Sequence, residues 1–262
     1  MEAVNLFVQA PPELKTMVEE ALQTKSIRHY TNTYEAGDSL FEQGLETRNT
    51  FFIHKGLVRL FSTAPDGYSK TIFIHTPGSL VGFQYFQDLP STGEADVAPA
   101  SAGLPKIGFE QDVVSASPDC RPSIMNAQVM TKSTITVINA QDFARYLKSD
   151  GEHCFIMAKY LFWQLSNQTR EAVNASLFSV LERFAALLLK LTSYNGNAHS
   201  DSPESSFVPF SNTDLAEMLG VHVNSITNAI SSLRKAGCID KYRGALMIVD
   251  REKLQSYASG LV

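Results

Sequence analysis

The C-terminal part of the sequence concentrates side chains that could contact a phosphate backbone. Residues 219–245 contain one acidic residue, Asp240, and these basic ones: Arg234, Lys235, Lys241 and Arg243. The segment therefore carries a local charge of +3, whereas the whole chain has a formal net charge of −5. A basic stripe in an acidic chain is the electrostatic pattern expected for phosphate contacts.

The residues just before this stripe could read the edges of base pairs. Arg is the usual partner of guanine, Asn pairs with adenine, and an apolar side chain contacts the thymine methyl group. The candidate reading residues include no Arg; they are His222, Val223, Asn224, Thr227 and Asn228. Their types predict an A·T-rich half-site, with the basic side chains contacting phosphates and supplying affinity rather than sequence choice.

Other reactive side chains are too scattered to form a catalytic or metal site. Cys120, Cys154 and Cys238 are far apart, and they cannot build a four-cysteine iron–sulfur cluster within one chain. We expect reduced thiols, and whether any of them is redox-active stays open. No phosphate-binding Gly-rich loop, GxSxG or HExxH motif occurs. We therefore predict no enzyme, no catalytic residues, no cofactor and no metal.

The composition is that of an ordinary soluble globular protein. The chain has 262 residues, of which 44% are hydrophobic and 19% charged. This length suits one large domain or two small ones. No apolar run approaches the roughly 18 residues of a membrane span, and the N-terminal residues do not resemble a signal peptide. The sequence thus predicts a cytoplasmic protein without membrane contact.

The part of the chain before the basic stripe is expected to position it, and its N-terminal half is rich in predicted β-strands. An amphipathic helix is predicted over residues 12–27, and short β-favouring runs separated by glycines follow. The predicted strands are 39–41, 50–54, 57–62, 71–75, 80–83 and 134–138. Their spacing is typical of a sandwich or barrel, and Pro65-Asp66-Gly67 predicts a hairpin turn. A proline-rich surface excursion is predicted at 88–122, and a short helix over residues 140–147.

A long periodic segment without Pro or Gly follows at residues 152–192. Its first part has a narrow stripe with alternating spacings of three and four: Ala158, Leu161, Leu165, Gln168, Ala172 and Ala175. Such a stripe favours close helix–helix pairing, and we predict an intermolecular dimer. The alternative is a helix packed on its own domain. Near Ser176 the pattern broadens, which indicates a second, buried helix.

The terminal module, residues 207–262, follows a polar linker at 193–206. Ser211 can cap a helix that ends at Gly220, with Asp214 completing a capping box. A second helix is predicted over 223–236, followed by strands at 238–241 and 245–249. This order is that of a winged helix-turn-helix, whose second helix enters the DNA major groove. The alternative is a small helical domain without a DNA role.

Two regions together resemble the Crp/Fnr family of bacterial transcription regulators. The matching β segments are Glu35-Ala36-Gly37-Asp38, Gln43-Gly44, Phe51 to Val58, Asp66-Gly67 and Pro77 to Gly82. The matching helical segments are Asp214-Leu215-Ala216, Leu219-Gly220 and Ser225-Ile226-Thr227. The resemblance covers nearly the whole chain.

The resemblance implies an α+β fold. Its expected parts are an N-terminal cyclic-nucleotide-binding-like β-roll, or jelly roll, in 1–151, a long dimerisation helix with a following helix in 152–192, and the winged helix-turn-helix in 207–262. Family members that bind cyclic nucleotides carry a Gly-Glu pair and, some ten residues later, an Arg for the phosphate. Here Phe83 follows Gly82, and no Arg occurs between Arg59 and Arg121. A buried phosphate would lack a counter-ion, so cyclic AMP is not the expected effector.

The chain is most similar in appearance to the branch of the family that senses halogenated phenols and regulates reductive dehalogenation. In that branch a Tyr on the long helix engages the phenolate, and Tyr160 matches it. Trp163 and Phe83 occupy positions where lysines are expected, so a neutral or differently charged aromatic ligand suits this chain better. The candidate effector residues are Phe73, Phe83, Tyr85, Tyr160 and Trp163. Their alternative role is core packing.

These observations predict a homodimeric, ligand-responsive regulator of transcription. Its expected partners are double-stranded operator DNA, a small and possibly aromatic effector, and a second copy of the chain. A contact with RNA polymerase is left open. The alternative function is a DNA-binding regulator whose β-roll is vestigial or senses redox state or haem.

Overall fold

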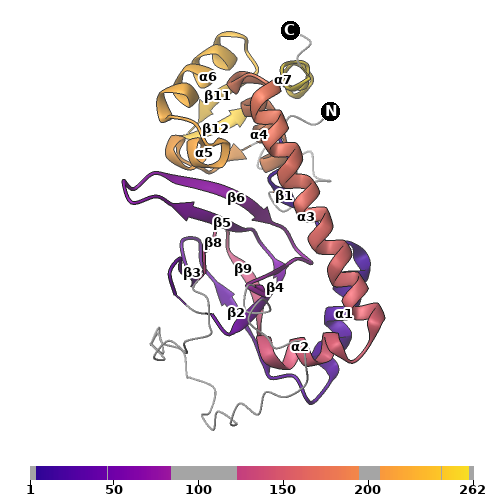
Figure 1. Cartoon of the computed structure of the whole chain (residues 1–262). Coiled ribbons are helices and arrows are strands. Elements are labelled where there is room, and N and C mark those ends of the chain that lie inside the picture. Colours follow the sequence, from indigo (N-terminus) through magenta and orange to yellow (C-terminus); the bar gives the residue numbers. More distant parts are fainter. Residues whose placement is uncertain (1–3, 46, 84–122, 195–206, 243, 260–262) are drawn as a thin grey trace.

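The computed structural model has a β-roll at one end, a winged helix at the other, and a long helix, α3 (Gly151–Leu177), along both (Figure 1). The structure describes residues 4–45, 47–83, 123–194, 207–242 and 244–259. The predicted excursion at 88–122 and most of the predicted linker lie outside the described residues.

The β-roll consists of two facing sheets. The first has the order β1 (Phe7–Val8), β6 (Ser69–His75), β5 (Val58–Thr63), β8 (Asn126–Val129) and β3 (Ser39–Phe41). The second has the order β2 (His29–Tyr34), β9 (Ser133–Asn139), β4 (Asn49–Lys55) and β7 (Leu80–Val81). Apolar residues such as Phe51, Leu60 and Val137 fill the space between the sheets.

Most predicted strands are confirmed, and the turn residues explain why. The Ala64 amide donates to the Tyr68 carbonyl at 2.8 Å, and Gly67 has a φ of 85°, which favours Gly. This closes the predicted hairpin between β5 and β6. Sequence reasoning missed β1, β2 and β8. In β2, His, Thr, Asn and Tyr residues lie partly or fully exposed, so this strand lacks a regular apolar alternation.

The first helix is shorter than predicted. Helix α1 (Pro12–Gln23) ends where Thr24 takes an extended conformation and its hydroxyl donates to the Ala21 carbonyl at 2.7 Å. This bond satisfies a carbonyl at the helix end. Ile27, which the periodicity placed in the helix, is buried beyond that end.

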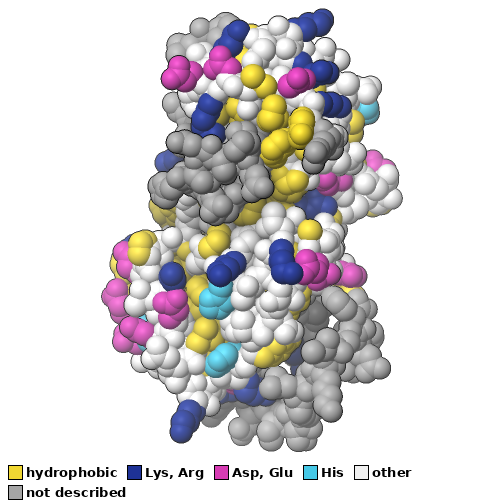
Figure 2. Space-filling view, turned by 180° about the vertical axis from the view of Figure 1, so that it is seen from behind, with side chains coloured by type: hydrophobic (Ala, Val, Ile, Leu, Met, Phe, Trp, Pro, Cys, Tyr) yellow, Lys and Arg dark blue, Asp and Glu magenta, His cyan; other side chains and the backbone are white. Residues whose placement is uncertain are grey.

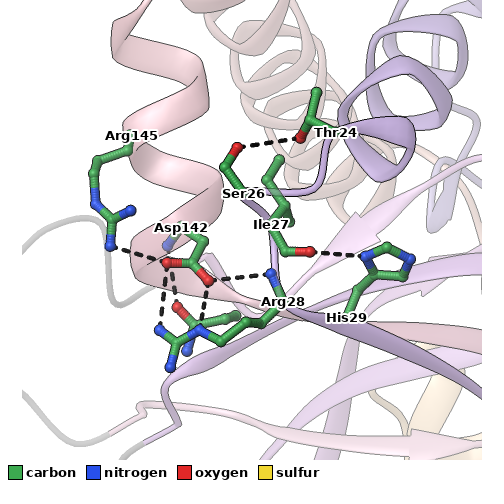
Figure 3. A network of polar contacts seen from close by, with 8 residues as sticks. Thr24, Ser26, Ile27, Arg28, His29, Asp142 and Arg145 are labelled. Carbon is green, nitrogen blue, oxygen red and sulfur yellow. Dashed lines mark hydrogen bonds and ion pairs between the residues drawn. The ribbon is translucent and has the colours of Figure 1, made fainter. Parts of the chain in front are cut away.

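A buried carboxylate connects the chain after α1 to helix α2 (Ala140–Lys148). Asp142, only 4% exposed, accepts hydrogen bonds from the Arg28 backbone amide at 3.1 Å and its Nε at 2.7 Å, and from Arg145 at 2.9 Å (Figure 3). Burial raises the pKa of the Asp142 carboxyl, but the hydrogen bonds and charges of Arg28, with the charge of Arg145, outweigh it and leave the pKa below its usual value. This network fixes α2, and therefore the start of α3, on the roll.

The long periodic segment forms two helices. Phe178 is extended and ends α3; Ser179 and Glu182 then cap α4 (Val180–Tyr194), since the Ser179 amide donates to the Glu182 carboxylate at 2.7 Å. The inner face of α4 is apolar and belongs to the core of the winged helix; its fully buried residues include Phe184, Leu187, Leu188 and Leu191.

The winged helix contains β10 (Phe207–Val208), α5 (Asn212–Leu219), α6 (Val223–Lys235), β11 (Ile239–Tyr242), β12 (Ala245–Ile248) and α7 (Arg251–Ala258). The predicted capping box is confirmed, because Ser211 and Asp214 bond each other's backbone amides. Gly220 is left-handed, with a φ of 63°, and ends α5 as expected. Sequence reasoning missed β10 and α7. Among the described residues, no helix is long and apolar enough to span a membrane.

Candidate nucleic-acid interface and effector region

Helix α6 is anchored by its apolar face, so its opposite face is free to contact a ligand. Ile226, Ala229, Ile230 and Leu233 are buried. Their spacing of three and four residues places them on one side of the helix. At its start, Nδ1 of His222 accepts a hydrogen bond from the Asn224 amide at 3.2 Å. His222 therefore caps the helix from an exposed position.

The outward face brings together the predicted reading residues. Asn224, Thr227 and Asn228 are exposed, whereas Val223 is half-buried. The Thr227 hydroxyl donates to the Val223 carbonyl at 3.1 Å, which leaves its oxygen able to accept a further hydrogen bond. Ser231 is exposed one turn after these residues and was missed, although its helical spacing from Asn228 places it on the same face.

The basic side chains differ in how far they are already paired. Arg234 forms an ion pair with Asp240 at 3.0 Å, while Lys235 and Lys241 are exposed. Hydrogen bonds from the Lys241 backbone amide and from Arg234 hold the pKa of Asp240 below its usual value. Figure 2 shows dark blue side chains at the upper end of the molecule, which holds the winged helix in Figure 1. Arg243 lies outside the described residues.

The candidate effector residues gather where α3 crosses the roll. Tyr160 is fully buried, and its ring lies 6.3 Å from that of Phe83. Phe73 and Trp163 pack against the same cluster, and Tyr85 lies outside the described residues. The Tyr160 hydroxyl donates to the Leu80 carbonyl at 3.0 Å. Burial raises the pKa of Tyr160 well above its usual value, so the phenol is neutral.

His75 is a member of this region that was not among the candidate effector residues. It is fully buried at the end of β6, with its Nδ1 3.4 Å from the Tyr160 hydroxyl and its ring 5.7 Å from that of Phe73. Burial lowers the pKa of His75 to about 3, and its Nε2 has no hydrogen-bond partner among the described residues. The six histidines are scattered along the sequence, and no pattern around them indicates that one contacts α3.

Two surface hollows in the described part of the chain lie elsewhere. One, of about 140 Å³, is lined by residues that include Lys15, His54 and Gly78. The other, of about 350 Å³, lies between α1 and the start of α3 beside Met17 and His153. Neither is lined by the predicted aromatic residues. No group of three or more His, Cys, Asp or Glu side chains in the described ranges could hold a metal ion.

The outer side of α3 carries large apolar side chains that are exposed in this chain. Its apolar face comprises Phe155, Ala158, Phe162, Leu165 and Ala172, all of which are exposed. Phe162 is 71% exposed and Leu165 is 63% exposed. The predicted stripe included Gln168, but its amide turns inward and donates to the Ile72 carbonyl. The predicted stripe missed Phe155 and Phe162, which are 60% and 71% exposed on this face.

Two family models match the chain on either side of α3. The model of the cyclic nucleotide-binding domain matches residues 31–98, and the model of the Crp-like helix-turn-helix domain matches residues 182–257. The order of these two matched domains is that of a Crp/Fnr-type regulator. As a Crp/Fnr-type chain, it is a DNA-binding transcription regulator with a ligand-binding domain, and the predicted α+β fold is confirmed.

Known relatives of this Crp/Fnr-type chain are regulators of transcription. The regulatory protein HlyX of Actinobacillus pleuropneumoniae is 20% identical over 222 residues, which are 84% of this chain and 78% of HlyX. A Crp/Fnr transcriptional regulator from Eubacterium rectale has a TM-score of 0.67 at 13% identity, covering 95% of both chains. CprK in complex with OCPA has a TM-score of 0.52 at 13% identity, covering 96% of this chain and 97% of CprK. At these identities the two structures show a shared fold.

Proposed function

We propose that this chain is a homodimeric regulator that binds a palindromic, A·T-rich operator and responds to a small aromatic effector. The observation that carries the proposal is the exposed face of α6, where Asn224, Thr227 and Asn228 project beside the basic Lys235 and Lys241. Asn side chains favour adenine, and none of the proposed reading residues is an Arg, which would favour guanine. A regulator of this kind acts on the chromosome, in the cytoplasm.

The apolar face of α3 supports the homodimer. A contiguous exposed apolar surface marks an interaction site, and the three- and four-residue spacing of these side chains suits pairing with the same face of a second copy. Two α6 helices related by a two-fold axis would contact half-sites whose centres are about one helical turn apart. The proposed operator is therefore an inverted repeat.

The aromatic residues at the roll and α3 support the proposed effector class. Phe83 and Tyr160 already form a ring contact, and the Tyr160 phenol and His75 are both neutral, so a cyclic phosphate would meet no counter-ion among these groups. This favours an uncharged aromatic ligand. The match of Tyr160 to the Tyr of the halophenol-sensing branch supports a placement near that branch, with a ligand of different charge. The alternative is a roll that is vestigial or senses redox state or haem.

Selection of bound duplexes from a random pool tests the DNA proposal. We expect an A·T-rich inverted repeat. Asn228→Ala should cost about 1–3 kcal/mol of binding free energy and relax specificity at one position, because a base contact is lost. Lys241→Ala should weaken binding to all sequences alike and reduce the salt slope by about one, because a phosphate contact is lost.

A matched control is Lys132→Met, which removes an exposed cation on the roll, away from α6. It should leave specificity and the salt slope unchanged. Recovery of a G·C-rich consensus, or of no inverted repeat, would show that other residues read the DNA.

The single tryptophan, Trp163, provides a test of the effector class. Binding of an aromatic ligand beside it should change its fluorescence and raise the melting temperature, because a ligand that binds only the native state stabilises it. Cyclic AMP should do neither. A response to micromolar cyclic AMP would contradict the assigned ligand class, and a lack of response to any aromatic compound in a screen would favour the vestigial roll.

A further inference from the structure

The β5–β6 hairpin of the roll lies directly against α5 of the winged helix (Figure 1). Arg59 on β5 forms an ion pair with Glu217 on α5, with 2.7 Å between Nη1 and Oε2. The two side chains are only 13% and 22% exposed. This contact joins residues 158 positions apart in the chain.

Arg59 is held in place by other residues of the roll. Its Nε and Nη2 donate to Oε1 of Gln128 on β8 at 3.0 and 2.8 Å, and its guanidinium lies 4.4 Å from the centre of the Phe61 ring. A planar guanidinium with several fixed partners has little freedom left to lose. It therefore presents Nη1 to Glu217 at a defined position on the sheet.

A second contact reaches the turn that follows α5. A Cβ built on Gly220 would lie 3.0 Å from Cε of Lys70 on β6. The Lys70 side chain thus packs along the backbone between α5 and α6. The hairpin holds α5 through its ion pair and the turn through this packing.

A third contact reaches α5 from helix α4. Arg183 on α4 donates to the Leu219 carbonyl, at the end of α5, at 2.9 Å and to Glu171 on α3 at 3.1 Å. Both charged side chains are buried, at 7% and 8% exposure. The end of α5 is therefore connected to α3 as well as to the roll.

We infer that Arg59 is a positioning residue for DNA recognition, acting through Glu217. Because α5 and α6 pack as one unit around a shared core, an ion pair on α5 sets the direction of α6 relative to the roll. The reading face of α6 remains exposed in this arrangement. A full palindrome requires both α6 helices of a dimer at fixed positions, whereas an isolated half-site requires only one. This inference rests on the proposed dimer and operator.

The test compares the affinity of the full chain for the selected palindrome and for an isolated half-site. Glu217→Gln, which keeps the side-chain shape, and Arg59→Met should each weaken palindrome binding by about fivefold or more and leave half-site binding unchanged. The double variant should be no weaker than the weaker single variant, because both changes remove the same contact. Lys132→Met, which breaks an exposed ion pair with Glu35, is the control.

Several outcomes would overturn the inference: unchanged or tighter palindrome binding, equal loss at the half-site, or effects of the two single variants that multiply. Circular dichroism establishes that each variant is folded, and Glu217→Gln suffices if Arg59→Met unfolds. If the unaltered chain binds neither duplex, the proposed function itself fails. If the unaltered chain binds the palindrome and the variants bind it with the same affinity, only the positioning role of Arg59 fails.

Discussion

Helices α3 and α4 are consecutive in the chain, but they place their apolar residues on opposite sides. On α4 the buried residues are mainly leucines and phenylalanine, as in an ordinary core helix. On α3 the buried side is apolar only near its start, at Ile156, Met157 and Tyr160. Farther along it carries Gln164, Asn167 and Glu171, whereas Phe162 and Leu165 are exposed. The apolar face of α4 is therefore buried within one chain, whereas the apolar face of α3 stays exposed to solvent.

The two helices, which the sequence presented as one periodic segment, therefore differ in role: α4 serves folding, and α3 is suited to association. Burying a large apolar side chain stabilises a protein by roughly 1.5–3 kcal/mol, so α4 contributes to folding of the single chain. Helix α3 would gain that contribution only on association. Two polar residues on its inner side bond the N-terminal domain: Gln168 donates to the Ile72 carbonyl, and Glu171 accepts from the Asn5 amide.

The largest expected effect tests the apolar face of α3. Leu165→Glu would bury two like charges between paired helices, which should cost about 3–5 kcal/mol of association free energy and produce monomers. Light scattering at micromolar concentration measures this directly. Arg170→Glu is the control, because Arg170 is exposed on the same helix but off the apolar face. An intact dimer for Leu165→Glu would mean that this face does not mediate association.

A substitution on α4 tests whether its buried face stabilises the single chain. Leu188 on α4 is fully buried. Leu188→Ala should reduce the free energy of unfolding by about 2–5 kcal/mol, because it leaves a cavity in the core of the winged helix. Leu165→Ala, measured by urea unfolding at concentrations where the chain is monomeric, should have little effect. Equal losses for the two variants would remove the distinction between the helices.

His75 lies against the inner side of α3, where its neutral ring meets Tyr160. Its pKa is about 3 in the folded chain against an ordinary 6.5, so below pH 6.5 only the unfolded chain gains the proton. The free energy of unfolding is therefore unaffected by His75 protonation above pH 6.5 and falls as the pH decreases from 6.5 toward 3. Between pH 7 and 5 the loss should be about 2 kcal/mol.

His75→Leu should remove that part of the pH dependence, which urea unfolding at each pH measures. Asp142 does not affect this slope between pH 7 and 5. Its pKa lies below the usual value, so its contribution to stability is lost only at lower pH. If His75→Leu shows the same slope as the unaltered chain between pH 7 and 5, then His75 is not buried neutral against α3.

Local signals in the sequence were sufficient for much of the candidate DNA interface. Ser211 and Asp214 have the spacing of a capping box, Gly220 suits a left-handed helix end, and the apolar spacing of α6 implies which side faces outward. The periodicity of α3 also indicated an associating helix. It could not show that Phe162 rather than Gln168 lies on the exposed side, because both positions fit a stripe of threes and fours.

The candidate effector region was predictable only in part. Tyr160 and Phe83 were singled out through resemblance, and the structure places their rings together. His75 was not among the candidate effector residues. Its role depends on the meeting of β6 with α3, residues 85 positions apart. No local pattern reports such a distant contact.

The sequence by itself determined the local elements of this protein: helix caps, turn glycines, most strands and the outward face of α6. These depend on backbone preferences and on contacts between residues three or four positions apart, which any short segment contains. Only the tertiary structure decided that β1 pairs in parallel with β6, that Asp142 holds Arg28, and that Arg59 meets Glu217. Such contacts form when distant segments are packed together, and their partners are selected by the geometry of the whole fold rather than by their neighbours in sequence.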